Sequence, residues 1–176
     1  MSRRLIAILA GVLVLAVAVY WFGFRQKSVE ADVQVPQLAA VIGEGEEAVG
    51  VAGNGAVVRW LPPPEDPPLP QLPLDEIPKG GKVRGTALEQ VRVLAAVPDQ
   101  LRPYVESSYF GESGVDVELT TGVELRFGDA SQARRKWKAV AAVLADPSVT
   151  SPSYVDVHAP TRPAYEDSGS ELPAAP

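Results

Sequence analysis

The sequence contains no cysteine, so disulfide bridges and thiolate metal sites are excluded. It contains a single histidine, His158, and no nucleophile signature stands near it. General acid–base and nucleophilic catalysis need a positioned base, which this pattern does not supply. A phosphate-binding loop and a dinucleotide fingerprint are also missing. We therefore expect a protein that is not an enzyme and that uses no cofactor and no small-molecule substrate.

Positive charge is scarce, because 16 Lys and Arg stand against 22 Asp and Glu, for a net charge of -6. A nucleic-acid surface needs concentrated positive charge, so we expect no nucleic-acid partner. The densest acidic groups are Glu44, Glu46 and Glu47, and the pair Glu65 and Asp66. Both groups fall in expected turns, where carboxylates are solvated, so we predict no metal site.

One long apolar run, Leu5 to Phe24, contains neither charge nor proline. At about 1.5 Å per residue, a helix over this run spans roughly 30 Å, the thickness of a bilayer core. Tyr20 and Trp21 stand near its end, where aromatic rings favour the membrane interface. The run predicts a transmembrane helix with Leu5, Tyr20, Trp21 and Phe24 as its membrane anchor positions.

A cleaved signal peptide is the alternative, because residues 1–4 are basic and residues 16–18 resemble a cleavage site. The length of the apolar run and its aromatic end favour an uncleaved anchor. With residues 1–4 as a short cytoplasmic tail, this layout predicts a single-pass protein whose C-terminal part lies outside the cytoplasm.

After a short linker, 25–28, the pattern predicts a soluble domain over 29–160. Alternation from Val29 to Val35 indicates a strand that Pro36 ends. Three short apolar runs then predict further strands, over 38–42, 48–52 and 56–61. Asn54 and Gly55 favour a hairpin between the last two runs.

Eight prolines between Pro62 and Pro78 exclude a helix or a central strand. We expect an extended loop that four apolar side chains attach to the domain: Leu69, Leu72, Leu74 and Ile77. A proline-rich docking ligand is the less favoured alternative.

Two helices are predicted, each with a capping box. The first begins at Thr86 with Glu89 three residues later, carries an apolar stripe (Leu88, Val91, Val93, Leu94, Val97) and ends before Pro98. The second spans about 130–145, with Asp129 as N-cap and Gln132 closing the box. Its apolar face comprises Ala133, Trp137, Val140, Ala141 and Leu144. The basic residues Arg134, Arg135, Lys136 and Lys138 fill the opposite face, which we expect to be solvated, with a partner site as the alternative.

Strands are predicted between the helices, over 104–110, 115–119 and 123–127, and a last strand over 154–158. Residues 161–176 have the composition of a disordered tail. The expected fold class is α+β: an N-terminal transmembrane helix followed by an antiparallel β-sheet domain packed by two helices.

This order of elements, together with several short motifs, resembles the β domain of the cell-division family FtsQ/DivIB. The motifs are Val115 to Leu119 with Gly122, Val123 to Gly128, Lys136 and Leu144 in the second helix, and Tyr154 to Val157 with Pro160. A Leu-Pro segment at Leu69 and Pro70 also resembles one that precedes the family's first helix. The resemblance extends over about 29–165.

The resemblance implies a bacterial inner-membrane protein that takes part in the cell cycle, in septum formation and in the divisome. It would bind other bitopic division proteins, FtsB and FtsL or similar, through the free edge of the last strand and the preceding helix. Val155 and Val157 should then face the core. The candidate partner-binding residues are Tyr154, Asp156, His158, Arg135 and Lys138.

One departure from the family is large, because only residues 25–28 separate the apolar run from the expected β domain. The family's POTRA domain has no counterpart there, so functions assigned to it are not expected of this chain. A membrane-tethered envelope chaperone or a cell-wall-binding module on the same fold remains the alternative.

Overall fold

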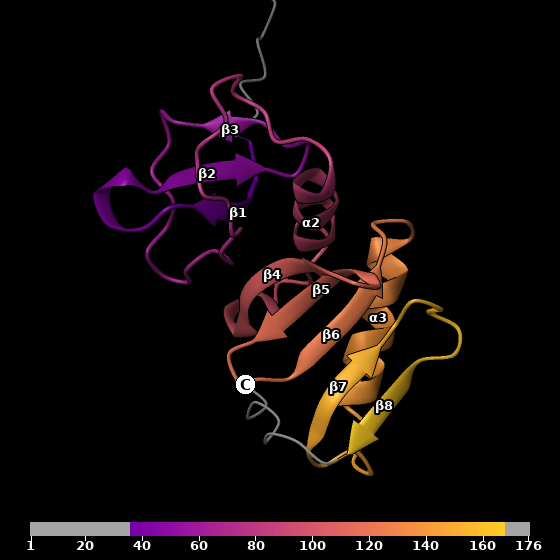
Figure 1. Cartoon of the computed structure of the whole chain (residues 1–176). Coiled ribbons are helices and arrows are strands. Elements are labelled where there is room, and N and C mark those ends of the chain that lie inside the picture. Colours follow the sequence, from indigo (N-terminus) through magenta and orange to yellow (C-terminus); the bar gives the residue numbers. More distant parts are fainter. Residues whose placement is uncertain (1–35, 168–176) are drawn as a thin grey trace, which may run out of the picture. The chain divides into compact units, whose positions relative to one another are not determined.

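The computed structural model describes residues 36–167, which belong to one compact unit (Figure 1). The predicted transmembrane helix, Leu5 to Phe24, and the predicted strand over 29–35 lie outside the described residues, as do residues 168–176. No helix within 36–167 is both long enough and apolar enough to span a bilayer. The described part is α+β, with two sheets and the helices α2 and α3.

A three-stranded antiparallel sheet comes first, built from β1 (Leu38–Ile42), β2 (Val49–Ala52) and β3 (Val57–Val58). A short 3-10 turn, η1 (Gly45–Glu47), lies between β1 and β2. The hairpin predicted at Asn54 and Gly55 is confirmed: Gly55 has a φ of 84°, and Asn54 Oδ1 accepts a 2.9 Å hydrogen bond from the Ala56 amide. β3 is shorter than the predicted run over 56–61.

The second sheet has the strand order β4-β5-β6-β7-β8. Its strands are β4 (Val105–Gly111), β5 (Gly114–Leu119), β6 (Glu124–Gly128), β7 (Pro152–Asp156) and β8 (Ala164–Asp167). Every pair is antiparallel except β6 and β7, which run parallel. The prediction of a wholly antiparallel sheet is wrong at this pair. The helix α3 connects β6 to β7. Such a crossover returns the chain to the end of the sheet at which β6 begins, so that β7 runs parallel to β6.

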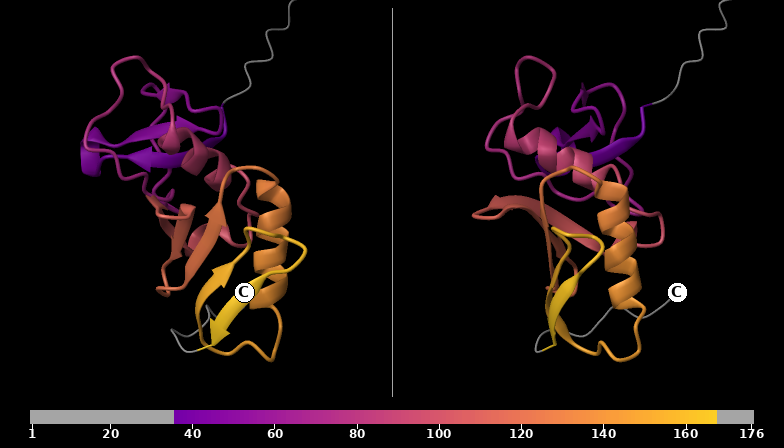
Figure 2. Two further views of the ribbon diagram at one scale, coloured as in Figure 1. Left: turned by 45° about the vertical axis from the view of Figure 1, so that its right-hand side comes forward. Right: turned by 90° about the vertical axis from the view of Figure 1, so that its right-hand side faces the viewer.

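The two helices supply much of the core. α2 (Thr86–Leu94) contacts β1, β4 and β5, and so lies between the two sheets, whereas α3 (Ala133–Leu144) covers one face of the five-stranded sheet (Figures 1 and 2). The indole N–H of Trp137 donates a 2.9 Å hydrogen bond to the Val93 carbonyl, which ties α3 to α2. The Trp137 ring packs on Phe127, with centroids 4.9 Å apart. Burial of Val91, Leu94 and Val140 confirms the predicted apolar faces.

Both predicted capping boxes are wrong. Gly85, not Thr86, is the N-cap of α2, and Glu89 instead accepts a hydrogen bond from the Ala130 amide at 3.1 Å. In α3 the N-cap is Gln132, while Asp129 accepts the Ser131 amide at 3.0 Å. A tertiary donor therefore takes the Glu89 carboxylate, whereas Asp129 accepts from a turn that precedes the helix.

Lys136 is buried, with 2% exposure, so its predicted place on the solvated face of the second helix is wrong. Its ammonium donates to the Phe127 carbonyl at 2.8 Å, the Asp129 carbonyl at 3.0 Å and Asp129 Oδ1 at 2.7 Å. Three protein acceptors replace the water that a buried ammonium would lose. Arg134, Arg135 and Lys138 are exposed, as expected.

The proline-rich segment packs on the domain, as predicted, with Leu69 and Leu72 buried. It also joins the two sheets. The Val41 amide donates to Pro70 O at 3.0 Å and the Leu72 amide to Val41 O at 2.9 Å, while Gln71 exchanges hydrogen bonds with β4 at 2.9 and 3.1 Å. Gln71 and Leu72 can donate at this joint because, unlike the prolines beside them, they retain an N–H, whereas Pro70 takes part only as an acceptor.

The end of the domain also differs from expectation. Tyr154 to His158 is not the last strand, because β7 is followed by β8, which pairs antiparallel with it. A turn in which the Arg162 amide donates to Ala159 O at 2.9 Å brings the chain back alongside β7. The predicted tail, 161–176, therefore contains a strand at 164–167, because β7 offers backbone partners that composition alone does not reveal.

Candidate interaction surface

The strand β8 forms one edge of the five-stranded sheet. Its residues 164–166 are exposed, and the Tyr165 side chain retains 42% of its accessible surface. Tyr165 is paired with Val155 and so lies on the α3 side of the sheet, whereas Glu166 is paired with Tyr154 on the other side. Among the described residues no strand pairs with the outer side of β8, so its backbone is open to an added strand.

The face of this sheet that α3 does not cover, called here the outer face, carries polar side chains in two cross-strand rows. Tyr109, Asp116, Arg126 and Asp156 are register partners in one row across β4 to β7. Glu118, Glu124, Tyr154 and Glu166 form the next row, across β5 to β8. Such direct neighbours lie close enough to interact.

Glu124 is the centre of a network on the outer face. The Tyr109 hydroxyl donates to Glu124 Oε2 at 2.6 Å, and Arg126 Nε donates to Glu124 Oε1 at 2.5 Å. The Arg126 guanidinium also lies 4.0 Å from the centroid of the Tyr154 ring, a cation–π contact. The hydrogen bonds from Tyr109 and Arg126 lower the pKa of Glu124, while burial and the bond to Glu124 raise the pKa of Tyr109.

Asp116 lies in the same row as Arg126 and is only 7% exposed. Its Oδ1 is buried without a hydrogen-bond partner among the described residues. Burial, and secondarily the charge of Glu124, raises the pKa of this carboxyl.

His158 follows β7 and closes one end of the outer face. Its Nδ1 is 2.9 Å from Asp156 Oδ1 and its Nε2 is 3.1 Å from the Ser113 carbonyl oxygen. Both partners are acceptors, so only the doubly protonated imidazolium can donate to both. The ring therefore links the β4–β5 hairpin to the end of β7 and, in this state, brings a positive charge to a mainly acidic face.

The structure brings together three of the predicted partner-binding residues, Tyr154, Asp156 and His158, on the outer face. Arg135 and Lys138 are exposed on α3, which covers the opposite face of the sheet. As predicted, Val155 and Val157 are fully buried. The five candidates therefore form two sets, one on each face of the sheet.

Sequence reasoning missed β8 and the network around Glu124. The available signal for β8 was the short segment Ala164 to Glu166, which contains Tyr165, an aromatic residue with high strand propensity. The network had a weaker signal, because Tyr109, Glu124 and Arg126 meet only when strands distant in the sequence pair.

The residues 36–167 hold no group of three or more His, Asp or Glu side chains placed to bind a metal ion. What the sheet offers instead is an open strand edge beside tyrosine and arginine, the residue types most often responsible for affinity at protein interfaces. The open edge and these side chains are typical of a surface that contacts another protein. Comparisons of the chain with protein-family models and with curated proteins give no match.

Proposed function

We propose that this chain is a non-enzymatic, single-pass membrane protein that acts as a scaffold in bacterial cell division, in the manner of the FtsQ/DivIB family. Its apolar run over 5–24 would anchor it in the inner membrane, and its β domain would lie outside the cytoplasm at the division septum. The motif order over 115–160, on which the resemblance rests, supports this role. The partners would be other bitopic division proteins, FtsB and FtsL or similar.

The observation that carries the proposal is the open edge of β8. An added strand would satisfy the unpaired N–H and C=O groups along that edge, while pockets and charges beside it would provide specificity. This edge replaces the one predicted at Tyr154 to His158, which β8 covers.

An added strand projects its side chains alternately to the two faces of the sheet. One set would approach the outer face near Glu166, next to Tyr154 and Asp156 in the neighbouring strand. The other set would approach the α3 side of the sheet near Tyr165, and α3 carries the exposed positive charges of Arg135 and Lys138. A strand bound at β8 would therefore present one set of side chains to each face of the sheet.

Binding of the full-length protein to the FtsB-like and FtsL-like proteins of the same genome tests this proposal. We expect Tyr165→Pro to weaken the complex by about tenfold or more, because proline removes an N–H and restricts φ in a short edge strand. A chain truncated after Asp167 retains β8 and is the matched control, for which we expect unchanged binding. Equal affinities for the proline variant and the wild type would exclude β8 as the docking strand.

Two further measurements address the rest of the proposal. Tyr154→Ala combined with His158→Ala should weaken binding if the outer face contributes, and unchanged binding would remove these residues from the site. A fluorescent fusion should concentrate at mid-cell in dividing bacteria, whereas a uniform envelope signal would contradict a role in division. A position of the gene among division and cell-wall synthesis genes would add support.

A further inference from the structure

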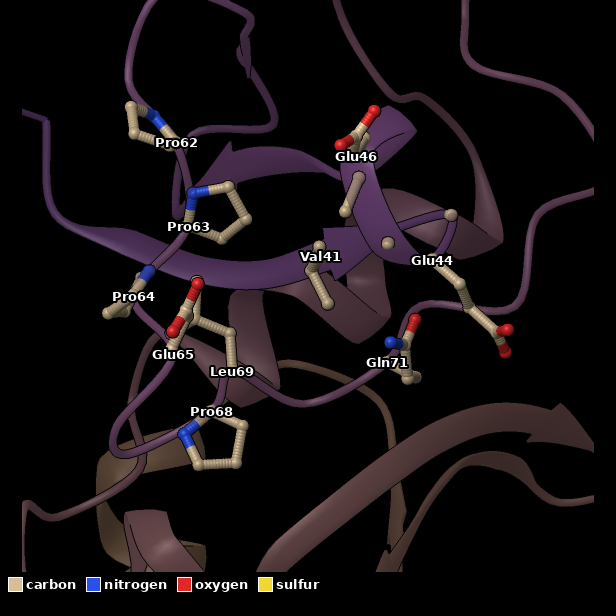
Figure 3. Close-up of a pocket in the computed structure, with 13 residues that line it drawn as sticks. Val41, Glu44, Glu46, Pro62, Pro63, Pro64, Glu65, Pro68, Leu69 and Gln71 are labelled. Atoms are coloured by element: carbon tan, nitrogen blue, oxygen red, sulfur yellow. The ribbon is translucent and has the colours of Figure 1, made fainter.

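A groove on the three-stranded sheet lies outside the surface described so far. It has a volume of about 720 Å³ and is bounded on one side by the η1 turn and on the other by the proline-rich segment (Figure 3). Val41 and Leu69, both largely buried, contribute apolar atoms to its lining. Its size is within the usual range of ligand pockets.

Three carboxylates, those of Glu44, Glu46 and Glu65, lie around this groove (Figure 3). All three residues are exposed, and none forms an ion pair with another described residue. No Lys or Arg is among the lining residues. The groove therefore has a uniform negative charge beside an apolar floor.

The groove is also poor in hydrogen-bond donors. Four lining residues are prolines, which have no N–H: Pro62, Pro63, Pro64 and Pro68. Three further lining residues, Val41, Ala48 and Gln71, already donate their amides to backbone carbonyls, and the three glutamate carboxylates only accept. A matching ligand must bring donors and positive charge, as arginine and lysine side chains do, together with apolar atoms for Val41 and Leu69.

The walls of the groove are ordered before any ligand arrives. Backbone hydrogen bonds of 3.0 and 2.9 Å connect Val41 to Pro70 and Leu72, and one of 3.2 Å from the Ala48 amide to Gly45 O closes the η1 turn. Proline restricts φ in the opposite wall. Little conformational entropy is therefore lost in forming the site, which favours binding of an extended segment.

We propose that this groove binds an extended basic segment of a partner protein, with an arginine or lysine head between the three glutamates and its alkyl stem, or an adjacent apolar side chain, on Val41 and Leu69. This site is separate from the β8 edge. Its occupant is a cationic peptide, recognised by charge and by donor–acceptor complementarity.

Fluorescence anisotropy tests the proposal, with full-length protein in non-ionic detergent and a dye-labelled, capped peptide of alternating leucine and arginine as the probe. Charge removal by Glu44→Gln, Glu46→Gln and Glu65→Gln together preserves side-chain size. We expect this triple variant to raise the dissociation constant by about tenfold or more. The matched control, Asp75→Asn with Glu76→Gln and Glu112→Gln, removes the same charge from exposed positions outside the groove.

The control triple should bind the peptide within about twofold of the wild type. An equal loss in both triples would show attraction to overall negative charge and would overturn the proposal. No binding to the wild type at about 1 mM peptide would overturn it as well. Displacement of the peptide by spermidine at equal concentration would indicate that the groove binds a free polyamine. This outcome would overturn the proposal of a protein segment as its occupant. Far-UV circular dichroism confirms that each variant is folded.

Discussion

The ammonium of Lys136 lies 2.7 Å from Oδ1 of Asp129, although the Lys136 side chain is only 3% exposed and that of Asp129 is 67% exposed. The pair connects the start of α3 to the loop after β6, and two backbone carbonyls complete the shell around the ammonium. A charged side chain that sequence pattern assigns to solvent therefore holds a helix against the sheet.

Replacing Lys136 with methionine should destabilise the domain. Lys136→Met keeps most of the apolar stem but leaves three acceptors without their donor, and we expect a loss of about 2 to 4 kcal/mol in unfolding free energy. Urea denaturation followed by circular dichroism measures it. The exposed neighbour provides the control, since Lys138→Met should change stability by about 0.5 kcal/mol or less. Similar losses in the two variants would contradict the assigned role of Lys136.

Acid should weaken the same pair. The hydrogen bond from Lys136, with further bonds from Ser131, lowers the pKa of Asp129 to about 2 in the folded state. A depressed carboxyl pKa contributes stability above the unfolded value of about 3.9, and this contribution is lost as the pH falls through the folded value. Because Asp129 is mostly exposed, we expect about 1 kcal/mol or less.

Asp129→Asn makes this contribution measurable. The stability difference between the wild type and this variant should be largest above about pH 4 and should shrink towards pH 2. Urea midpoints across this range measure the difference. A constant difference over the whole range would show that the Asp129 charge is not involved.

His158 should titrate above the ordinary histidine range. Partial burial alone would lower its pKa, but the Ser113 carbonyl and the Asp156 carboxylate together raise it. Stability from this link is therefore complete below the unfolded pKa of about 6.5 and is lost as the pH rises through the folded value. The chain has no other histidine, so its ring signals in a proton NMR titration are unambiguous.

We expect Asp156→Asn to shift the His158 midpoint downwards, because the variant replaces a carboxylate with a neutral amide. A wild-type midpoint at or below about 6.5 would contradict the arrangement in which both ring nitrogens donate.

Gly114 should not tolerate a side chain. Its φ is 115°, and a β-carbon there would overlap the Gly128 backbone of the paired strand β6. We expect Gly114→Ala to cost about 3 kcal/mol or more in unfolding free energy. Gly80, in an exposed turn with open space around it, is the matched site, and Gly80→Ala should change stability by about 0.5 kcal/mol or less. Comparable urea midpoints for both variants would contradict this account.

Local periodicity was enough to locate most strands. The predicted run Leu38 to Ile42 coincides with β1, and the runs over 115–119 and 123–127 differ from β5 and β6 by one residue at their ends. Apolar spacing likewise identified the buried faces of α2 and α3, including Trp137. These features depend on residues close in sequence, so the chain alone reveals them.

Other features depend on partners that are distant in sequence. Lys136 is buried because Phe127 and Asp129 supply acceptors, and Glu89 leaves its expected cap because the Ala130 amide is within reach. The free edge of the sheet is β8 and not β7 for the same reason, since a short segment becomes a strand only where a neighbour offers its backbone.

The sequence by itself determined the α+β class, most strand and helix positions and most of the apolar core, because hydrophobic periodicity expresses which face each element buries. Only the tertiary structure decided which strands are neighbours, which edge stays open and which charges are buried. Those outcomes follow from hydrogen-bond partners that meet only after the chain has folded.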